Sequence, residues 1–281
     1  MISLIKIILY KNPILLDLVF RVRYYSGYCF YIVKKFFNLP YLGGYLFSQQ
    51  ELFRGRKKII KKILESLKNK KIKFVNILEI GVYAGENTLF IAKILKEINI
   101  KFNITCVDPW RSYNVKHDQE FNFYYKKFND GLDNGKVLNL FKYNLKCILI
   151  EKKVKIIKKT SKLFLLKNTQ IFDLIFIDGS HDYKDVLFDI QYSKKFLKNG
   201  GIMVGDDYEV KFSDANPDVF KNLLRNNKEL SFQSKQNISF HPGVTKAVYD
   251  HFGNIDQING LFVIKKNKKN FYSANRKLKL N

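Results

Sequence analysis

The sequence predicts an α/β fold: a doubly wound, mostly parallel sheet preceded by a helical N-terminal extension. With 281 residues, of which 46% are hydrophobic, the chain is long and apolar enough to bury a large core. From Phe74 onward, short apolar runs that end in an acid or a glycine alternate with helical stretches. Continuous apolar strands separated by helices are typical of a parallel sheet covered on both faces.

The first 70 residues are predicted to be a separate helical extension, and residues 71–281 the α/β domain. The extension mixes aromatic and basic residues and is broken by Pro13, Pro40 and the Gly43-Gly44 pair. Charges interrupt its apolar stretches, so we expect neither a signal peptide nor a membrane span. The lack of a cysteine pattern typical of disulfides predicts a cytoplasmic location. The extension could make a peripheral contact with an anionic membrane or a lipid-linked glycan, or serve as a lid or a contact in a homo-oligomer.

Five apolar runs are the predicted parallel strands, and they lie at residues 74–81, 103–110, 154–160, 172–180 and 200–207. Between the second and third runs, residues 111–152 are rich in Tyr, Phe and Lys. This segment is either an insertion that covers the carboxyl edge of the sheet, where ligands of such folds bind, or an ordinary pair of packed helices. After the fifth run, residues 243–253 read as a helix and residues 260–266 as a closing strand.

The formal charge of +25 would suit a nucleic acid, but the kind and spread of the basic residues argue against one. Only seven of the 50 basic residues are Arg, and the Lys are scattered among Asn and Ile. Asn216-Pro217-Asp218 has no following aromatic residue to stack on a flipped base. Cys29, Cys106 and Cys147 lie far apart, which predicts neither a zinc site nor a disulfide framework.

The first two strands end in residues suited to a small ligand. The turn after the first strand contains Glu79, Gly81 and Gly85, and glycines there allow a sharp bend and a close approach by a ligand. An acid at this turn would repel a dinucleotide pyrophosphate but attract the ammonium group of a methionine moiety. Asp108 ends the second strand, where a carboxylate can accept hydrogen bonds from ribose hydroxyls. Either feature alone is also a common structural element.

The fourth and fifth strands end in three acids and a histidine. Asp178 and His181 follow the fourth strand, a helix is expected from about Asp182 to Lys198, and Asp206 and Asp207 follow the fifth strand. About 17 helical residues span about 25 Å, and a six-residue strand returns about 20 Å, so the acids should meet at one edge. Mg²⁺ would compensate their charge, and His181 would be a general base. The alternatives are a helix cap, a structural histidine and a strand-terminating turn.

The runs LEIGVYAGENT, CVDPW, IDGSHDY and GGIMVGDD resemble the class I S-adenosylmethionine-dependent methyltransferases. Within them, the resemblance is to the metal-dependent macrocin and mycinamicin sugar O-methyltransferases, over roughly residues 74 to 266. It implies a seven-stranded Rossmann-like methyltransferase sheet, S-adenosylmethionine bound at the first two strands, and Mg²⁺ that orients a sugar hydroxyl.

The same resemblance assigns roles by position. Asp178, Asp206 and Asp207 would hold the metal and His181 would be the base; the cofactor would contact Glu79, Gly81, Gly85, Thr88, Asp108 and Ser161. Asp206 departs from the pattern, in which we expect Glu. The predicted function is therefore O-methylation of a sugar or glycoconjugate precursor. A catechol-like small molecule, a nucleic acid, or a binding role without chemistry are the alternatives.

Overall fold

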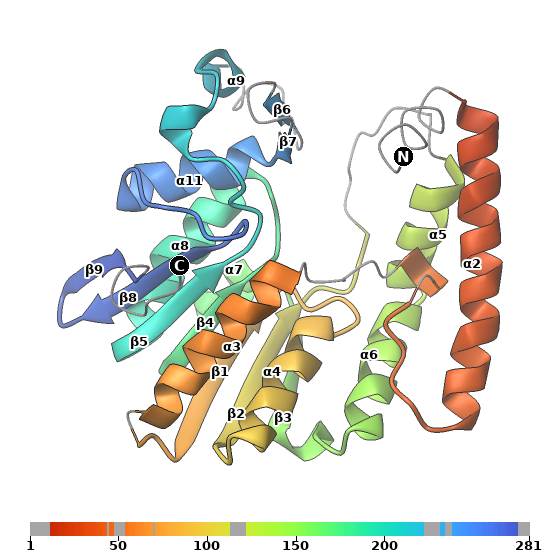
Figure 1. Cartoon of the computed structure of the whole chain (residues 1–281), viewed down its shortest axis with the longest axis horizontal. Coiled ribbons are helices and arrows are strands. Elements are labelled where there is room, and N and C mark those ends of the chain that lie inside the picture. The colour runs from red at the N-terminus through yellow and green to blue at the C-terminus, as the bar shows by residue number, and fades with distance from the viewer. Residues whose placement is uncertain are drawn as a thin grey trace. The chain divides into compact units, whose positions relative to one another are not determined.

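The computed structural model describes residues 12–43, 45–47, 54–69, 71–112, 122–221, 231–233 and 238–274 (Figure 1). Gly44, the first eleven residues and residues 113–121 of the segment between the second and third strands lie outside these ranges. The chain forms two compact units: unit 1 comprises residues 1–51, 83–89 and 110–151, and unit 2 comprises residues 52–82, 90–109 and 152–281. Each unit is described by itself.

Unit 2 contains a seven-stranded sheet in the order β3-β2-β1-β4-β5-β8-β9. The first five strands of the chain pair in parallel, and β8 and β9 are antiparallel. This confirms the predicted fold class: β2 and β3 are added on one side of β1, and β4 and β5 on the other side. The strands are β1 (Phe74–Ile80), β2 (Lys101–Asp108), β3 (Val154–Lys158), β4 (Phe172–Ile177), β5 (Leu197–Gly205), β8 (Phe262–Asn267) and β9 (Asn270–Ser273).

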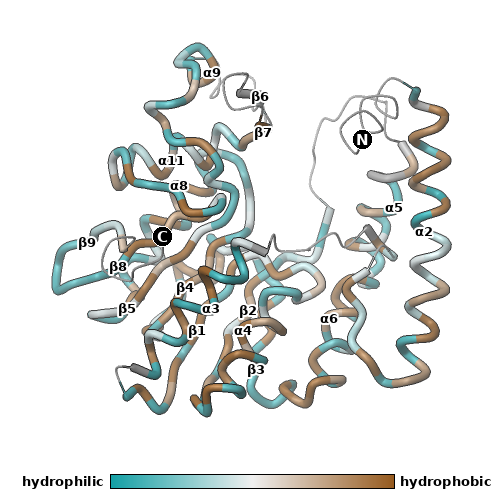
Figure 2. The backbone as a smooth tube through the Cα atoms, in the orientation of Figure 1, coloured by the Kyte–Doolittle hydropathy of each residue, from teal (hydrophilic) through white to brown (hydrophobic). Residues whose placement is uncertain are grey.

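The central strands are continuous apolar runs, as their brown colour in Figure 2 shows, so both faces of the sheet need to be covered by helices. Val186 and Ile190 of α8 and Val248 of α11 join a buried core with Ile175 of β4. Figure 1 shows α3 and α4 on the opposite face from α8 and α11. The helices of this unit are α3 (Arg54–Asn69), α4 (Glu86–Glu97, whose first turn is grouped with unit 1), α7 (Ser161–Leu165), α8 (Tyr183–Phe196), α9 (Asp218–Lys221) and α11 (Pro242–Phe252).

Element boundaries differ from the predicted ones by up to three residues, and the junction of α8 and β5 is one example. Asp182 caps α8 by accepting from the backbone N–H of Lys184 at 2.9 Å, but the helix ends at Phe196 and not at Lys198. The reason is that Leu197 already pairs with Phe172 in the sheet. The final strand pair β8–β9 extends the predicted closing strand, and a small hairpin of β6 (Ser231–Gln233) and β7 (Ile238–Phe240) was not predicted.

Unit 1 is helical, with α2 (Pro13–Phe36), α5 (Asn122–Asp133) and α6 (Lys136–Cys147). The side chain of Asn144 on α6 is fully buried and donates to the carbonyls of Tyr41 and Ala84, while its oxygen accepts from the Tyr41 N–H. Asn12 caps α2, and Pro13 occupies the first turn, where its missing N–H is not needed. Among the described helices, none has the length and apolar character that a membrane span requires.

Candidate active site

The carboxyl ends of β1, β4 and β5 meet at one edge of the sheet through backbone hydrogen bonds. The N–H of Asp178 donates to the carbonyl of Ile80 at 2.8 Å, and the N–H of Asp206 donates to the carbonyl of Ile177 at 3.0 Å. These bonds continue the parallel ladders by one residue beyond the last strand positions. The acids that follow β4 and β5 are therefore fixed at the same edge as the turn that follows β1.

Gly81 has a reason to be glycine beyond the sharp bend and the ligand approach that the sequence predicted. Its φ is +79°, and a Cβ at this position would lie 1.7 Å from the carbonyl oxygen of Asp178. Only glycine lets the β1 turn pass so close to the end of β4. The requirement thus comes from packing between two turns of the protein, whether or not a ligand also approaches this backbone.

The other predicted cofactor residues fall into both units. In unit 2, Glu79 and Asp108 are almost fully buried at the ends of β1 and β2, and Asp108 Oδ2 accepts from the N–H of Val82 at 2.9 Å. Ser161 begins α7 and hydrogen-bonds Asp189 of α8. In unit 1, Thr88 is completely buried, and a Cβ on Gly85 would lie 2.3 Å from the Phe141 ring.

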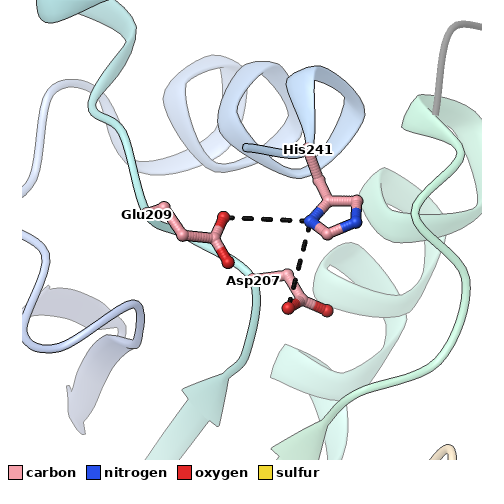
Figure 3. Close-up of side chains that lie close together, drawn as sticks. All are labelled: Asp207, Glu209 and His241. Atoms are coloured by element: carbon pink, nitrogen blue, oxygen red, sulfur yellow. Dashed lines mark ion pairs between the residues drawn. The ribbon is translucent and has the colours of Figure 1, made fainter. Parts of the chain in front are cut away.

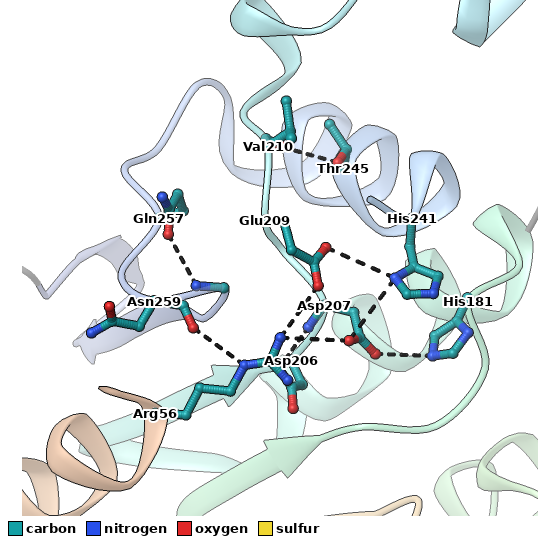
Figure 4. A network of polar contacts seen from close by, with 11 residues as sticks. Arg56, His181, Asp206, Asp207, Glu209, Val210, His241, Thr245, Gln257 and Asn259 are labelled. Carbon is teal, nitrogen blue, oxygen red and sulfur yellow. Dashed lines mark hydrogen bonds and ion pairs between the residues drawn. The ribbon is translucent and has the colours of Figure 1, made fainter. Parts of the chain in front are cut away.

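Arg56 of α3 lies at the centre of the acidic residues, as Figure 4 shows. Its Nη1 is 2.6 Å from Asp206 Oδ1, and its Nη2 is 3.2 Å from Glu209 Oε1 and 3.8 Å from Asp207 Oδ1. Its Nε donates to the carbonyl of Asn259 at 3.2 Å. A buried guanidinium with three acidic neighbours compensates much of their charge.

His181 and His241 face the same acids from two other segments. His181 Nε2 is 2.9 Å from Asp207 Oδ2, and the two imidazole rings lie 4.1 Å apart between centroids. His241 precedes α11, whose Gly243 allows close packing, because a Cβ there would lie 2.1 Å from the carbonyl oxygen of His181. Asp207 itself has a φ of +59°, a strained value for a non-glycine residue that is found preferentially at functional sites.

The pKa values of the three predicted metal ligands are shifted in different directions by burial and by neighbouring charges. Burial, and then the charges of Asp206 and Asp207, raise the pKa of Asp178 well above its usual range. Burial and the charge of Asp207 likewise raise the pKa of Asp206. Burial opposes ionisation of Asp207 too, but the hydrogen bond from His181 and the nearby cations outweigh it and lower the pKa of Asp207.

The donor set Asp178, Asp206 and Asp207 has the oxygen chemistry that Mg²⁺ prefers, but its surroundings do not fit the ion well. Asp206 Oδ1 already binds Arg56 at 2.6 Å and accepts from the N–H of Asp207 at 2.7 Å. Arg56 supplies the positive charge for which Mg²⁺ was predicted. The assignment of these residues to Mg²⁺ remains a prediction.

Three residues of this site were absent from the sequence predictions: Arg56, Glu209 and His241. Glu209 carried a usable signal, since it continues the acidic run Asp-Asp-Tyr-Glu after β5. His241 stands immediately before the Pro-Gly start of a predicted helix. Arg56 carried none, because nothing in an extension rich in Lys distinguishes this basic residue from its neighbours.

A doubly wound sheet with this strand order is the fold of the class I S-adenosylmethionine-dependent methyltransferases. Buried acids lie at the ends of β1 and β2 and directly after β5, namely Glu79, Asp108 and Asp206. Residues 78–208 match the family model described as a methyltransferase domain. The match spans the edge from β1 to the residues that follow β5. No curated protein sequence matches the chain significantly.

Solved structures share the fold at low sequence identity. The O-methyltransferase NovP has 14% identity, a TM-score of 0.50, and an alignment covering 79% of this chain and 84% of its own. The O-methyltransferase from Bacillus cereus in complex with SAH has 15% identity and a TM-score of 0.40 over 76% and 88% of the two chains. TomG from Streptomyces achromogenes has 13% identity and a TM-score of 0.40 over 77% and 71%. At such identities the likeness concerns the fold alone.

Proposed function

We propose that the protein transfers the methyl group of S-adenosylmethionine to a hydroxyl oxygen of a small acceptor, with His181 as the general base. The observation that carries this proposal is the contact of 2.9 Å between His181 Nε2 and Asp207 Oδ2 at the carboxyl edge of the sheet. A histidine held by an ionised carboxylate is a common arrangement for removing a proton near neutral pH.

The contact also selects the atom that takes the proton. In the neutral ring, Nε2–H donates to Asp207, so the lone pair resides on Nδ1. Nδ1 would accept the hydroxyl proton as the acceptor oxygen bonds to the methyl carbon and the carbon–sulfur bond breaks. The low pKa of Asp207 keeps its carboxylate ionised, which stabilises the imidazolium that forms.

Glu79 and Asp108 are the residues that we assign to the cofactor. Both are buried carboxylates at the ends of adjacent parallel strands, with Glu79 paired with Cys106 two positions before Asp108. Glu79 would attract the ammonium group of the methionine moiety, and Asp108 would accept from the ribose hydroxyls. When bound, S-adenosylmethionine supplies an electrophilic methyl group on its sulfonium.

Calorimetric titration with S-adenosylmethionine tests the cofactor assignment. Asp108→Asn should weaken binding about tenfold or more, while its amide oxygen can still accept from the Val82 N–H. Asp173→Asn is the matched control, because Asp173 lies at the amino end of β4 and accepts there from the Asn76 N–H. Equal affinities of the two variants would contradict the assignment.

We assign the acceptor to sugars or glycoconjugate precursors on the sequence resemblance, with catechol-like molecules as the alternative. A panel of sugar nucleotides and phenols, assayed with methyl-labelled cofactor, separates the two classes. His181→Asn should then lower kcat about 10²- to 10⁴-fold and leave cofactor affinity unchanged. Chelation with EDTA tests the predicted Mg²⁺: turnover that survives it would exclude a required metal.

A second proposal concerns α2, whose outward face is apolar along its whole length. Leu16 and Tyr24 point into unit 1, whereas the opposite face exposes side chains by 46–82%: Ile14, Leu18, Val22, Tyr25, Ile32 and Phe36. Lys34 and Lys35 lie in its last turn. We propose that this face rests on an anionic lipid surface, since an amphipathic contact of this kind combines apolar burial with attraction to lipid charge.

Co-sedimentation with vesicles of phosphatidylserine and phosphatidylcholine tests the lipid contact. Val22→Glu should abolish binding, and Leu166→Glu, an equal charge change at an exposed leucine after α7, should not. If Val22→Glu instead converts a dimer into a monomer in sedimentation velocity, the face is covered by a second copy and the lipid proposal is wrong.

A further inference from the structure

We propose that Asp207, Glu209 and His241 form a binding site for a divalent transition-metal ion (Figure 3). Each residue offers one ligand atom, and the three atoms lie within 4.8 Å of one another. This set shares only Asp207 with the predicted Mg²⁺ ligands. The site is an addition to the proposed methyl transfer and does not depend on it.

The two distances from His241 match those between ligands of one ion and are longer than those of hydrogen bonds. His241 Nδ1 is 3.8 Å from Glu209 Oε2 and 3.9 Å from Asp207 Oδ1. Ligands that each lie about 2.0–2.2 Å from a shared metal are about 3–4 Å apart. Glu209 Oε2 and His241 Nδ1 are both shielded from solvent, and neither makes a hydrogen bond. Two buried atoms whose lone pairs have no partner are costly, and a shared cation would bind both lone pairs, with Nδ1 in its unprotonated form.

The remaining carboxylate oxygens are held by other residues, which fixes the direction of the ligand atoms. Asp207 Oδ2 contacts His181 Nε2 at 2.9 Å, and Glu209 Oε1 contacts Arg56 Nη2 at 3.2 Å (Figure 4). Such outer contacts orient metal ligands and adjust their basicity. Each acid therefore presents its other oxygen toward His241.

The two backbone segments that carry the ligands are tied together. Tyr208, between the two acids, is fully buried, and its N–H donates to the carbonyl of Gly260 at 2.8 Å. In the first turn of α11, Thr245 Oγ1 donates to the carbonyl of Val210 at 2.9 Å, and the Thr245 N–H donates to the carbonyl of His241 at 3.1 Å. The position of His241 relative to the acids is thus set by buried hydrogen bonds.

The donor chemistry indicates the class of ion. One imidazole nitrogen with two carboxylates suits Zn²⁺, Co²⁺, Fe²⁺ or Mn²⁺, whereas Mg²⁺ prefers oxygen ligands alone and retains several waters. Three protein ligands leave positions open for water or an acceptor oxygen. Because His181 contacts Asp207, an ion here would lie next to the proposed base.

Titration of the full-length chain with Co²⁺, followed by its visible absorption, tests the site without any methyl-transfer assay. One ion should bind, and His241→Asn and Glu209→Gln should each weaken it at least tenfold. Asp178→Asn and the control His251→Asn should retain it, and a tenfold excess of Mg²⁺ should not displace it. Thermal unfolding confirms that each variant is folded.

A second measurement needs no substitution. The sequence has four histidines, so their imidazole NMR signals can be followed separately, and Mn²⁺ should broaden His241 and His181 first and spare His251. Absence of binding, or equal binding by all variants as for an adventitious ion only, would overturn the proposal. Loss in Asp178→Asn but not in His241→Asn would assign the metal to the oxygen-only set. S-adenosylmethionine binding, measured separately, reports on the proposed function.

Discussion

Replacing Arg56 by Met should destabilise the protein by about 3–5 kcal/mol, the usual effect of removing one partner from a buried ion pair. The Arg56 side chain is 11% exposed and that of Asp206 4%, and their atoms approach to 2.6 Å. Met keeps much of the aliphatic packing, so the loss reports mainly on charge. Asp206 and its acidic neighbours would be left buried without their guanidinium.

The chain contains a matched control for this experiment. Arg21 Nε and Asp17 Oδ2 on α2 are also 2.6 Å apart, but their side chains are 51% and 37% exposed. Arg21→Met should therefore change stability by less than about 1 kcal/mol. Because the two ion pairs have the same distance but differ in burial, comparing the two variants separates the effect of solvent exposure from that of geometry.

Urea unfolding followed by far-ultraviolet circular dichroism measures both variants. The double variant Arg56→Met/Asp206→Asn should be more stable than Arg56→Met alone, because it removes the uncompensated carboxylate as well. If Arg56→Met costs no more than Arg21→Met, the buried network does not stabilise the fold and the reasoning is refuted.

Three further substitutions test other features. Gly81→Ala should lower the free energy of unfolding by about 3 kcal/mol or more because of the clash with the turn after β4. Gly135 has a φ of +68° and open space around it, so Gly135→Ala should lower it by only about 1–2 kcal/mol. Similar melting temperatures of the two variants would contradict this. Burial raises the pKa of Asp189 to about 7, above the unfolded value near 3.9, so the contribution of Asp189 to stability should fall as pH rises from about 4 to 7, by on the order of 4 kcal/mol at most. Asp189→Asn should remove this contribution and make the fall in stability less steep than in the wild type, and an unchanged pH profile would count against it. Asn144→Ala leaves three buried backbone groups of unit 1 without their partner and should lower the free energy of unfolding by about 2–3 kcal/mol. Asn139 is exposed, so Asn139→Ala should change it hardly at all. The fluorescence of the single tryptophan reports unfolding of both variants.

The sequence was sufficient to predict the sheet because its central strands are continuous apolar runs. The runs that became β1, β2, β4 and β5 each end in an acid or a glycine that marks the carboxyl edge. Their alternation with helices determined the parallel pairing. The β6–β7 hairpin could not be predicted, since strands of three residues give no readable alternation.

The sequence predicted the positions of particular residues better than it predicted their roles. Asp178, His181, Asp206 and Asp207 were expected at one edge, and the backbone bonds at Ile80 and Ile177 place them there. Their partners could not be inferred, because a side-chain contact depends on which distant residue reaches the edge. Arg56 is 150 residues away from Asp206 in the sequence.

By itself, the sequence determined the doubly wound sheet, the order of its strands along the chain, and the group of acids with one histidine at its carboxyl edge. Those features follow from hydrophobic periodicity and from helix and strand lengths, which are local. Only the tertiary structure decided that Arg56 neutralises Asp206 and that Glu209 and His241 face Asp207. Electrostatic partners of this kind are set by packing between segments far apart in the chain, and no local pattern encodes them.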